Sequence, residues 1–381
     1  MTSELPKEET PVRRHGQLLQ LNWIRAIAAL LVVAYHCEVT MMLPKYFGAS
    51  TLPFFKAGHS GVQLFFVLSG FVIYLAHHRD SEGDGSIVAR FAAKRFRRIY
   101  PSLWIVLVPL IILSLFGFAT RVPSNADVAL SLLILPAQEE VILATEWTLR
   151  HEILFYAMFV CFLWNRRIGF WLLVAWGFIG LPLALFDDKG WLIDFIFNNN
   201  HVLFLCGVGI AWLYIRGYSA AGPYFLFAGL IVFAVTFYFG ISKQIPPNGE
   251  LLLFGLGAAG IIHGACSMPF LNRRIVPLEE AGAASYALYL IHYPLISLLV
   301  KLAVKLNTAV AAPRALYFVV IIVICQVIAI VFHHLIEAPL MKASWMQRLF
   351  LPARATAAAS GFQGPAPDIV EPQHARTSSS D

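Results

Sequence analysis

The chain has 381 residues, of which 59% are hydrophobic and only 13% are charged, and its mean hydropathy is +0.70. No water-soluble fold of this size needs so much apolar surface, so the composition predicts an integral membrane protein. In such a protein the net charge of +6 reports membrane topology first and gives no indication of nucleic-acid binding. The expected surroundings of the chain are therefore a lipid bilayer.

The polar segment 1–18 lacks the basic start, short apolar core and small-residue cleavage site of a signal peptide. We therefore expect it to be a cytoplasmic N-terminal segment. The long apolar runs begin directly after it, so the predicted transmembrane domain covers residues 19–340.

Several apolar runs reach about twenty residues, the length with which a helix crosses about 30 Å of hydrocarbon. Short alternating segments typical of a membrane β-barrel do not occur, so we predict an all-α, polytopic helical bundle of about ten transmembrane helices. The expected spans are 19–41, 58–76, 100–118, 149–164, 168–186, 200–216, 220–240, 249–266, 283–304 and 314–336. The apolar stretch 127–136 before the fourth span is either re-entrant or interfacial.

The distribution of basic residues predicts the orientation of these spans. With the N-terminus inside, the inner segments hold 18 Lys and Arg residues and the outer segments hold 8. This asymmetry and the even number of spans place both termini in the cytoplasm. Residues 351–381 are rich in Pro, Ala, Ser and Gly without periodicity, so we expect a disordered cytoplasmic tail.

The five cysteines all lie in apolar segments and form no CxxC pair. This pattern predicts small buried hydrophobic residues and neither a disulfide framework nor a metal site.

The first span, "LNWIRAIAALLVVAYHCE", carries ionisable residues inside an apolar run. Arg25 and His36 are eleven residues apart, which leaves an offset of about 20° and an axial separation of about 16 Å, so they share one helical face. Glu38 points elsewhere, about 200° from His36. Arg25 could simply extend to the membrane surface and His36 could make a structural hydrogen bond. Ionisable groups at membrane depth more often face a cavity, which favours a functional site.

The segment "RFAAKRFRRIYPSLW" places a basic cluster immediately before the third span. Such a cluster is typical of a positively charged anchor at anionic lipid. It is also typical of a guanidinium clamp, because planar guanidinium groups bind phosphate bidentately. Composition alone favours the anchor.

Two further helical stripes carry polar groups. Thr148, Glu152 and Tyr156 recur every four residues, and Glu152 needs a partner at membrane depth, for which His36 or Arg25 would serve. A second face combines polar side chains at i, i+4 and i+7, namely Ser285, Tyr289 and His292. One such stripe is often contact surface between helices. Several of them facing one bundle predict a hydrated pocket, to which Ser69 of the second span would contribute.

Six stretches together, in this order, resemble the membrane-bound acyltransferase 3 family, whose members O-acylate bacterial surface polysaccharides and related glycans. They are "LNWIRAIAALLVVAYH", "GVQLFFVLSGF", "KRFRRIYPSLW", "EWTLRHEILFYAM", "SYALYLIHYPL" and "HHLIEAPL", and the resemblance runs from residue 21 to about 340. The chain is similar in particular to the exopolysaccharide acetyltransferase branch. We expect no counterpart here of the extracytoplasmic hydrolase-like domain that some members carry.

The resemblance implies roles for individual residues. His36 matches the family's essential histidine and Arg25 its essential companion. Arg95 and Arg98 match the Arg-x-x-Arg motif thought to handle the acyl donor, and Glu152 matches an acidic position. The chain departs from the family pattern at two places: Gln63 stands where many members carry aspartate, and Asn22-Trp23 replaces the commoner Asp-Gly.

The expected function is therefore a multi-pass acyltransferase of the inner (plasma) membrane. It would transfer an acyl group, most simply acetyl from acetyl-CoA, to a hydroxyl of an exopolysaccharide, O-antigen or related glycan, which could be lipid-linked. Acyl-CoA would be a substrate, and no bound cofactor is expected. Polysaccharide assembly proteins are possible partners. A transporter of a lipid-linked sugar or acyl carrier is the alternative, although repeated halves and discontinuous helices are not evident. A non-catalytic subunit of an export complex is a third possibility.

Overall fold

The computed structural model describes residues 18–118, 121–138, 142–183, 190–309 and 312–343. This part of the chain is a bundle of helices and contains no β-strand. Its elements are α1 (Gln20–Met41), η1 (Pro53–Ala57), α2 (Ser60–His77), α3 (Gly85–Leu115), α4 (Asn125–Leu133), α5 (Glu146–Trp164), α6 (Arg166–Leu183), α7 (Trp191–Ile196), α8 (Asn200–Ile215), α9 (Gly222–Ile241), α10 (Pro247–Ser267), η2 (Pro269–Leu271), α11 (Val276–Ala283), α12 (Ser285–Ala309), α13 (Arg314–Phe332), η3 (His333–Glu337, a π-helical turn) and α14 (Ala338–Lys342).

Within these residues, nine helical segments are long and apolar enough to cross a membrane. They correspond to nine of the ten expected spans, so the prediction of an all-α polytopic membrane protein is confirmed. The remaining expected span, 149–164, is present as α5 but is not among the nine. Its first two turns carry Glu146, Arg150 and Glu152, which lower its hydropathy.

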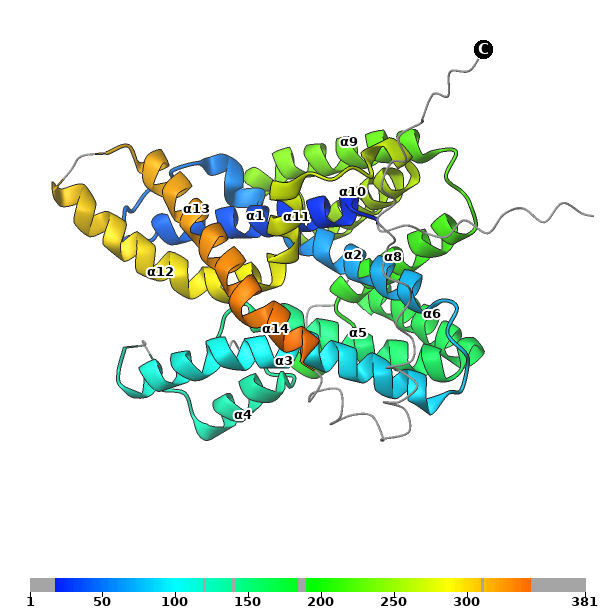
Figure 1. Cartoon of the computed structure of the whole chain (residues 1–381). Coiled ribbons are helices and arrows are strands. Elements are labelled where there is room, and N and C mark those ends of the chain that lie inside the picture. Colours follow the sequence, from blue (N-terminus) through cyan, green and yellow to red (C-terminus); the bar gives the residue numbers. More distant parts are fainter. Residues whose placement is uncertain (1–17, 119–120, 139–141, 184–189, 310–311, 344–381) are drawn as a thin grey trace, which may run out of the picture.

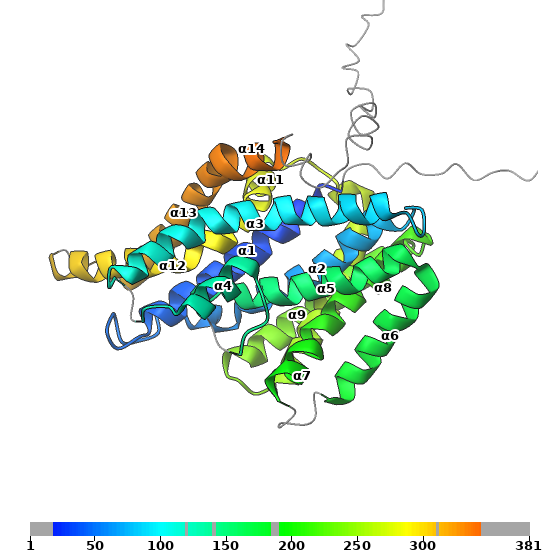
Figure 2. The ribbon, with the colours of Figure 1, turned by 90° about the horizontal axis from the view of Figure 1, so that it is seen from below.

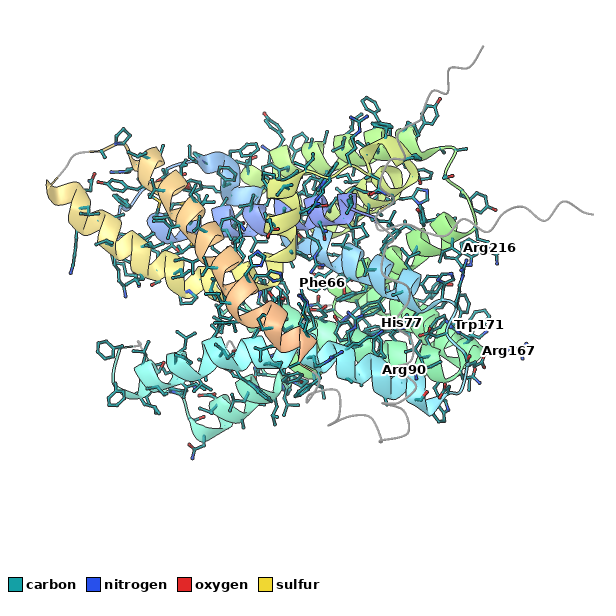
Figure 3. All side chains as sticks on the ribbon, in the orientation of Figure 1. Phe66, His77, Arg90, Arg167, Trp171 and Arg216 are labelled. Carbon is teal, nitrogen blue, oxygen red and sulfur yellow. The ribbon has the colours of Figure 1, made fainter. Side chains whose placement is uncertain are left out.

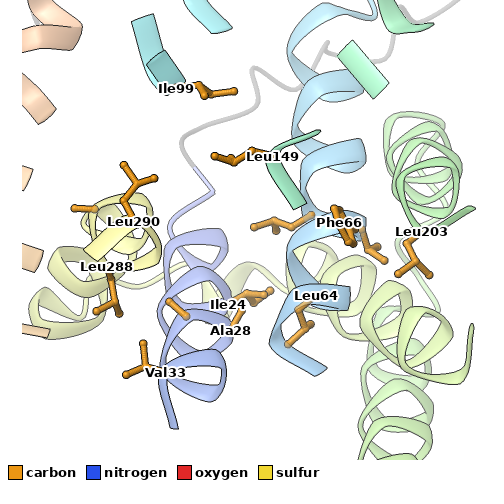
Figure 4. Packing of buried hydrophobic residues seen from close by; sticks show 14 of the residues in the cluster. Ile24, Ala28, Val33, Leu64, Phe66, Ile99, Leu149, Leu203, Leu288 and Leu290 are labelled. Atoms are coloured by element: carbon orange, nitrogen blue, oxygen red, sulfur yellow. The ribbon is translucent and has the colours of Figure 1, made fainter. Parts of the chain in front are cut away.

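Helix α1 lies in the interior of the bundle, where it contacts α2, α10, α11, α12 and α13 (Figure 1). Small and apolar residues of α1, including Ile24, Ala28 and Val33, are buried between α2 and α12 (Figure 4). On the α12 side they face Leu288 and Leu290 (Figure 4). The ionisable residues of α1 are therefore surrounded by protein on several sides.

Helix α3 is the longest helix and packs against α5, α12 and the η3–α14 segment (Figure 2). Its N-terminus is capped by the Asp84 carboxylate, which accepts a hydrogen bond of 2.7 Å from the Ser86 backbone N–H. Hydrogen bonds from Ser86 hold the pKa of Asp84 below its usual value. The cap fixes where α3 begins, and hence the position of the basic cluster one to four turns later.

The stretch 127–136, predicted to be re-entrant or interfacial, forms most of the short helix α4. α4 begins with a capping box at Ser124 and ends at Ile134, whose φ is +53°. Trp104 of α3 donates from Nε1 to the Leu132 carbonyl at 2.9 Å, and the Tyr100 hydroxyl donates to the Leu133 carbonyl at 3.1 Å. Helix α4 is thus tied to the side of α3.

Two glycines allow α2 and α8 to approach closely. A Cβ atom at Gly70 of α2 would lie 2.0 Å from the Phe204 carbonyl oxygen, and one at Gly207 of α8 would lie 2.0 Å from the Val67 carbonyl oxygen. Small residues at such crossings bring helix backbones into direct contact. Gly70 and Gly207 thus form a small-residue contact surface between α2 and α8.

The substitution Gly207→Ala should destabilise the bundle by about 1–3 kcal/mol, because the new methyl group forces α2 and α8 apart. The measurement is the melting temperature of the purified protein in detergent. Gly209→Ala, in the same helix, is the matched control, since a Cβ atom there meets nothing within 4 Å. Equal melting temperatures for the two variants would contradict the close approach.

The basic ends of several helices lie toward one side of the bundle. Figure 3 shows Arg90, Arg167 and Arg216 toward the right-hand side.

The predicted N-terminal segment 1–18 and tail 351–381 fall outside the described residues, apart from Leu18. All five cysteines are free thiols, and Cys37, Cys266 and Cys325 are buried.

Candidate active site

A cavity of about 390 Å³ opens between α1, α2, α3, α5 and α12. Apolar residues form much of its wall. Its polar lining consists of Arg25, Ser69, Lys94, Arg95, Arg97, Arg98, Thr148, Glu152, Tyr156, Ser285, Tyr286 and Tyr289. We refer to it as the arginine cavity. Eight of the ten candidate site residues expected from the sequence lie in its wall, although they come from five different helices. The two that do not line it are His36 and His292.

Arg98 is held by a carboxylate that the sequence analysis did not select. Its Nη1 donates to Oε1 of Glu337, which is fully buried at the end of η3. The other carboxylate oxygen of Glu337 lies 2.8 Å from Nδ1 of His333. The π-helical turn between His333 and Glu337 brings both side chains to face one another, and such turns often occur at functional sites. Glu337 therefore fixes the guanidinium of Arg98.

The remaining cations of the cavity are less completely neutralised. The guanidinium of Arg95 lies 5.4 Å from the ring centroid of Phe91 and 5.5 Å from that of Tyr156. Among the described residues, neither Arg95 nor Arg25 forms an ion pair. Arg25 is half-buried and lies in the electrostatic field of Arg98, Glu152 and Glu337. The described lining of the cavity thus holds five cationic side chains and one carboxylate, that of Glu152, which favours an anionic ligand.

Glu152 is bound within the wall of the cavity. Its Oε1 accepts hydrogen bonds from the hydroxyl of Tyr156, one turn later on α5, and from the hydroxyl of Ser69 on α2 at 3.3 Å. No hydrogen bond joins Glu152 to His36. Of the two partners expected from the sequence, Arg25 lines the same cavity as Glu152 and His36 does not.

The α12 stripe supplies the wall opposite α5. The hydroxyl of Tyr289 contacts the Thr148 hydroxyl and donates to the carbonyl of Thr145 at the start of α5. Ser285, one turn before Tyr289, is buried, and its hydroxyl oxygen has no hydrogen-bond partner among the described residues. A buried hydroxyl without a partner in a cavity wall is a ready contact for a polar ligand.

His36 and His292 lie beyond the far end of the arginine cavity and do not line it. Val32, one turn before His36, is in the cavity wall, as is Tyr289, three residues before His292. The two imidazole rings are 5.0 Å apart, and Nε2 of His292 lies 3.4 Å from Nδ1 of His36. The predicted stripe on α1 is therefore continuous, from Arg25 through Val32 to His36.

The partners of this histidine pair determine its neutral tautomers. Nδ1 of His36 is 2.9 Å from the Val32 carbonyl oxygen, and Nδ1 of His292 is 2.9 Å from that of Leu288. A carbonyl oxygen only accepts, so in both neutral rings the proton is on Nδ1. Nε2 of His292 then carries a lone pair toward the Nδ1–H of His36.

This arrangement leaves the lone pair of His36 on Nε2. No described residue makes a hydrogen bond to that nitrogen. A half-buried imidazole with an unoccupied basic nitrogen and a fixed tautomer has the properties of a general base.

The sequence signal for the missed residues was present but weak. Glu337 stands in "HHLIEAPL", where a carboxylate follows a strongly apolar span, and such a group needs a partner. The pairing of His36 with His292 joins residues 256 positions apart, which no spacing rule predicts. The described residues contain no group of three or more His, Cys, Asp or Glu side chains that could hold a metal ion.

The sequence model of a family described as "Acyltransferase domain" matches residues 18–334, which include α1, the histidine pair and the polar lining of the arginine cavity but not Glu337. The chain belongs to this acyltransferase family. It is therefore an enzyme that transfers acyl groups, and the nine membrane-capable helices among its described residues make it a multi-pass membrane protein. The family resemblance seen in the sequence is confirmed.

Three relatives are similar over most of the chain. The "Exopolysaccharide production protein ExoZ" of Rhizobium meliloti (strain 1021) is 28% identical over 77% of this chain and 93% of its own length. The "Peptidoglycan O-acetyltransferase OatA" of Listeria monocytogenes serovar 1/2a is 23% identical over 73% of this chain and 49% of its own length. The "Putative acetyltransferase ORF330" of Acidianus two-tailed virus is 24% identical over 76% of this chain and 86% of its own length. No solved structure matches the chain.

Proposed function

We propose that this enzyme transfers an acyl group, in the simplest case acetyl, from acyl-CoA to a hydroxyl of a cell-surface glycan such as an exopolysaccharide. The observation that carries the proposal is the imidazole of His36, with its basic Nε2, just beyond the far end of the arginine cavity. The names of the relatives, an exopolysaccharide production protein and a peptidoglycan O-acetyltransferase, support a glycan acceptor.

The arginine cavity is suited to the donor. Guanidinium groups bind phosphate bidentately, and CoA carries several phosphates at one end of a long flexible arm. Arg95 and Arg98 would bind these phosphates, with Glu337 holding Arg98 in place. The apolar and hydroxyl-bearing wall between α2, α5 and α12 would receive the arm and direct its thioester toward Val32 and His36.

His36 would act as general base at Nε2. It takes the proton from the acceptor hydroxyl while the hydroxyl oxygen attacks the thioester carbonyl carbon. The carbon–sulfur bond then breaks, and the proton passes from Nε2 to the departing CoA sulfur, giving an ester and a thiol. His292 would keep the proton on Nδ1 of His36 and stabilise the imidazolium through the 3.4 Å contact. In the alternative role, His36 carries the acyl group briefly itself.

Arg25 would bind the phosphate end of the donor together with Arg95 and Arg98, because its guanidinium is in the cavity and without an ion pair among the described residues. The separation of about 16 Å along α1 keeps it away from the thioester at His36. Glu152, Tyr156 and Ser69 form a hydrogen-bonded group beside it. Their proposed role is to orient Arg25 and the donor rather than the His36 ring.

The proposed location is the inner (plasma) membrane, with both termini and the arginine cavity on the cytoplasmic side. The 18 to 8 distribution of Lys and Arg between the predicted inner and outer segments supports this orientation. Arg90, Arg167 and Arg216 gather toward one side of the bundle, as the same rule requires (Figure 3). Donor CoA is then available directly from the cytoplasm.

The test of this function is transfer of labelled acetyl from acetyl-CoA in membranes that contain the enzyme. We expect the label in a base-labile ester on the surface glycan, and none with membranes from a deletion strain. A transporter of a lipid-linked sugar would move its cargo without incorporating label. Release of free CoA thiol without labelled glycan would contradict the proposed acceptor.

Arg95→Lys is expected to raise the KM for the acyl donor about tenfold with a smaller change in kcat, because an ammonium group keeps the charge but loses the bidentate geometry. The measurement is initial rate against donor concentration. Arg90→Lys is the matched control, since Arg90 lies on the same helix but is exposed and bonded only to Ser86, at 2.9 Å. A donor KM that is equal in the two variants would remove Arg95 from the donor site.

A further inference from the structure

A second cavity, of about 1030 Å³, opens at the other end of α1. Its wall is formed by the end of α1, by η1 and the segment that joins it to α2, and by the turn between α9 and α10. We refer to it as the second cavity. The residues in its wall are Tyr35, Val39, Met42, Leu43, Pro44, Lys56, His59, Gly240, Ile241, Ser242, Lys243, Gln244, Ile245, Pro246, Pro247 and Glu250. None of them lines the arginine cavity.

The second cavity contains a partly exposed polar pair, His59 and Glu250. Nε2 of His59 lies 3.4 Å from Oε1 of Glu250, and the two side chains keep exposed fractions of 33% and 13%. Glu250 Oε1 is itself buried and has no hydrogen-bond partner of good geometry among the described residues. A buried carboxylate oxygen in this condition leaves hydrogen-bonding capacity unused.

Tyr35 lines the second cavity and contacts His36. Its ring is 5.4 Å from the His59 ring and 5.1 Å, edge to face, from the His36 ring. His36 lines neither cavity, but Val32 in the wall of the arginine cavity and Tyr35 in the wall of the second cavity are both its neighbours on α1. Because Arg25 and Met42 mark opposite ends of α1, the two cavities approach His36 from opposite sides.

Glu38 keeps the wall of the second cavity in place. It is fully buried, and its carboxylate accepts hydrogen bonds from the Ser50 hydroxyl and from the backbone N–H groups of Thr51 and Leu52, the last at 2.9 Å. These residues lead directly into η1, which carries Lys56. Because donors surround the buried carboxylate of Glu38, these hydrogen bonds fix the segment 50–52 that precedes η1.

We propose that the second cavity binds the acceptor, and that the acceptor is a saccharide whose reacting hydroxyl is brought past Tyr35 to Nε2 of His36. The proposal rests on the proposed function and assigns a site to its second substrate. Tyr35 supplies the face on which a sugar ring lies, and the His59–Glu250 pair supplies hydrogen bonds to sugar hydroxyls.

The chemistry of the wall favours a saccharide over other ligands. An aromatic face beside a carboxylate, an imidazole and the amide of Gln244 matches a ring that has apolar C–H faces and a hydroxyl rim. A wall for acyl chains would be apolar throughout. A wall for phosphate groups would carry the guanidinium groups found in the arginine cavity, whereas here the cations are Lys56 and Lys243 and a carboxylate accompanies them.

The experiment uses the full-length enzyme in lipid nanodiscs and, as acceptor, an oligosaccharide prepared from the producing cell's surface glycan by partial hydrolysis and removal of its esters. Tyr35→Ala and Glu250→Gln should each raise the acceptor KM at least tenfold and leave the donor KM unchanged. Calorimetric titration of the same oligosaccharide without donor should show a matching loss of binding. Tyr35→Phe, which keeps the ring, should restore most of the affinity.

The matched controls are Tyr224→Ala and Glu279→Gln. Tyr224 is 78% exposed at the start of α9, the opposite end from the cavity, and Glu279 lies on α11. Acceptor KM and binding that are unchanged in Tyr35→Ala and Glu250→Gln, with melting temperatures like those of the controls, would overturn the proposal. Failure of the proposed function would give a different result, because the unaltered enzyme would then form no saccharide ester. Calorimetry would still report whether the second cavity binds the oligosaccharide.

Discussion

Replacing His36 by glutamine is expected to lower the rate of acyl transfer by about 100- to 10,000-fold, because the amide cannot accept the proton of the acceptor hydroxyl. The side chain is similar in size, and because its amide lies near the position of Nε2, the variant also loses the Nδ1 contacts to Val32 and His292. The rate is measured with labelled acetyl-CoA and purified enzyme, together with the KM values of both substrates. We expect the loss in kcat, with both KM values close to those of the unaltered enzyme.

The matched control is His78→Gln at the end of α2. His78 also donates from Nδ1 to a carbonyl of its own helix, that of Leu75 at 2.9 Å, but it lies away from both cavities. This variant should keep its activity. A His36→Gln enzyme that inserts normally and retains a rate near that of the control would remove His36 from the reaction.

Replacing Glu337 by glutamine is expected to destabilise the protein by about 3–5 kcal/mol, because it leaves the charge of Arg98 without its buried carboxylate. The effect on function should be large as well. Arg98 would lose its fixed position, and the KM for acyl-CoA should rise. The melting temperature in detergent gives the first effect, and donor titration of the folded fraction gives the second.

Glu279→Gln is the control for this variant. Glu279 pairs with Arg274 at 2.9 Å, but the Arg274 side chain is 75% exposed, so the loss should be no more than about 1 kcal/mol. If Glu337→Gln and Glu279→Gln have the same melting temperature and the same donor KM, then Glu337 neither stabilises the bundle nor positions Arg98.

The sequence predicted the helices well because lipid imposes a strict rule on length and hydropathy. Nine of the ten expected spans are among the membrane-capable helices. The exception, α5, shows the limit of that rule. Its charged first turns are stabilised by contacts within the bundle, such as the ion pair of Arg150 with Glu146 at 3.2 Å, which hydropathy does not register.

The arginine cavity could also be anticipated, because helical periodicity places polar residues on one face of each helix. Arg25, Glu152 and Tyr289 were selected in this way, and all three line the cavity. The periodicity of single helices could not predict which side chains meet between two helices. The partner of His36 proved to be His292 and not Glu152, since the crossing of α1 with α12 decides which side chains meet.

Two features had at most a weak sequence signal. Glu337 reaches Arg98 only through the π-helical turn η3, an irregularity that propensities do not predict. The second cavity is assembled from α1, η1 and the turn between α9 and α10, whose residues look like ordinary loop and helix-end positions. Both features depend on tertiary packing.

The arrangement of two cavities on either side of His36 is tested most directly by the sidedness of the reaction. The enzyme is reconstituted in vesicles in one orientation, and labelled acetyl-CoA and the de-esterified oligosaccharide are supplied on chosen sides. The structure predicts labelled ester when the donor is on the side of Arg95 and the oligosaccharide is on the opposite side. Labelled ester only when both substrates share one side would contradict it.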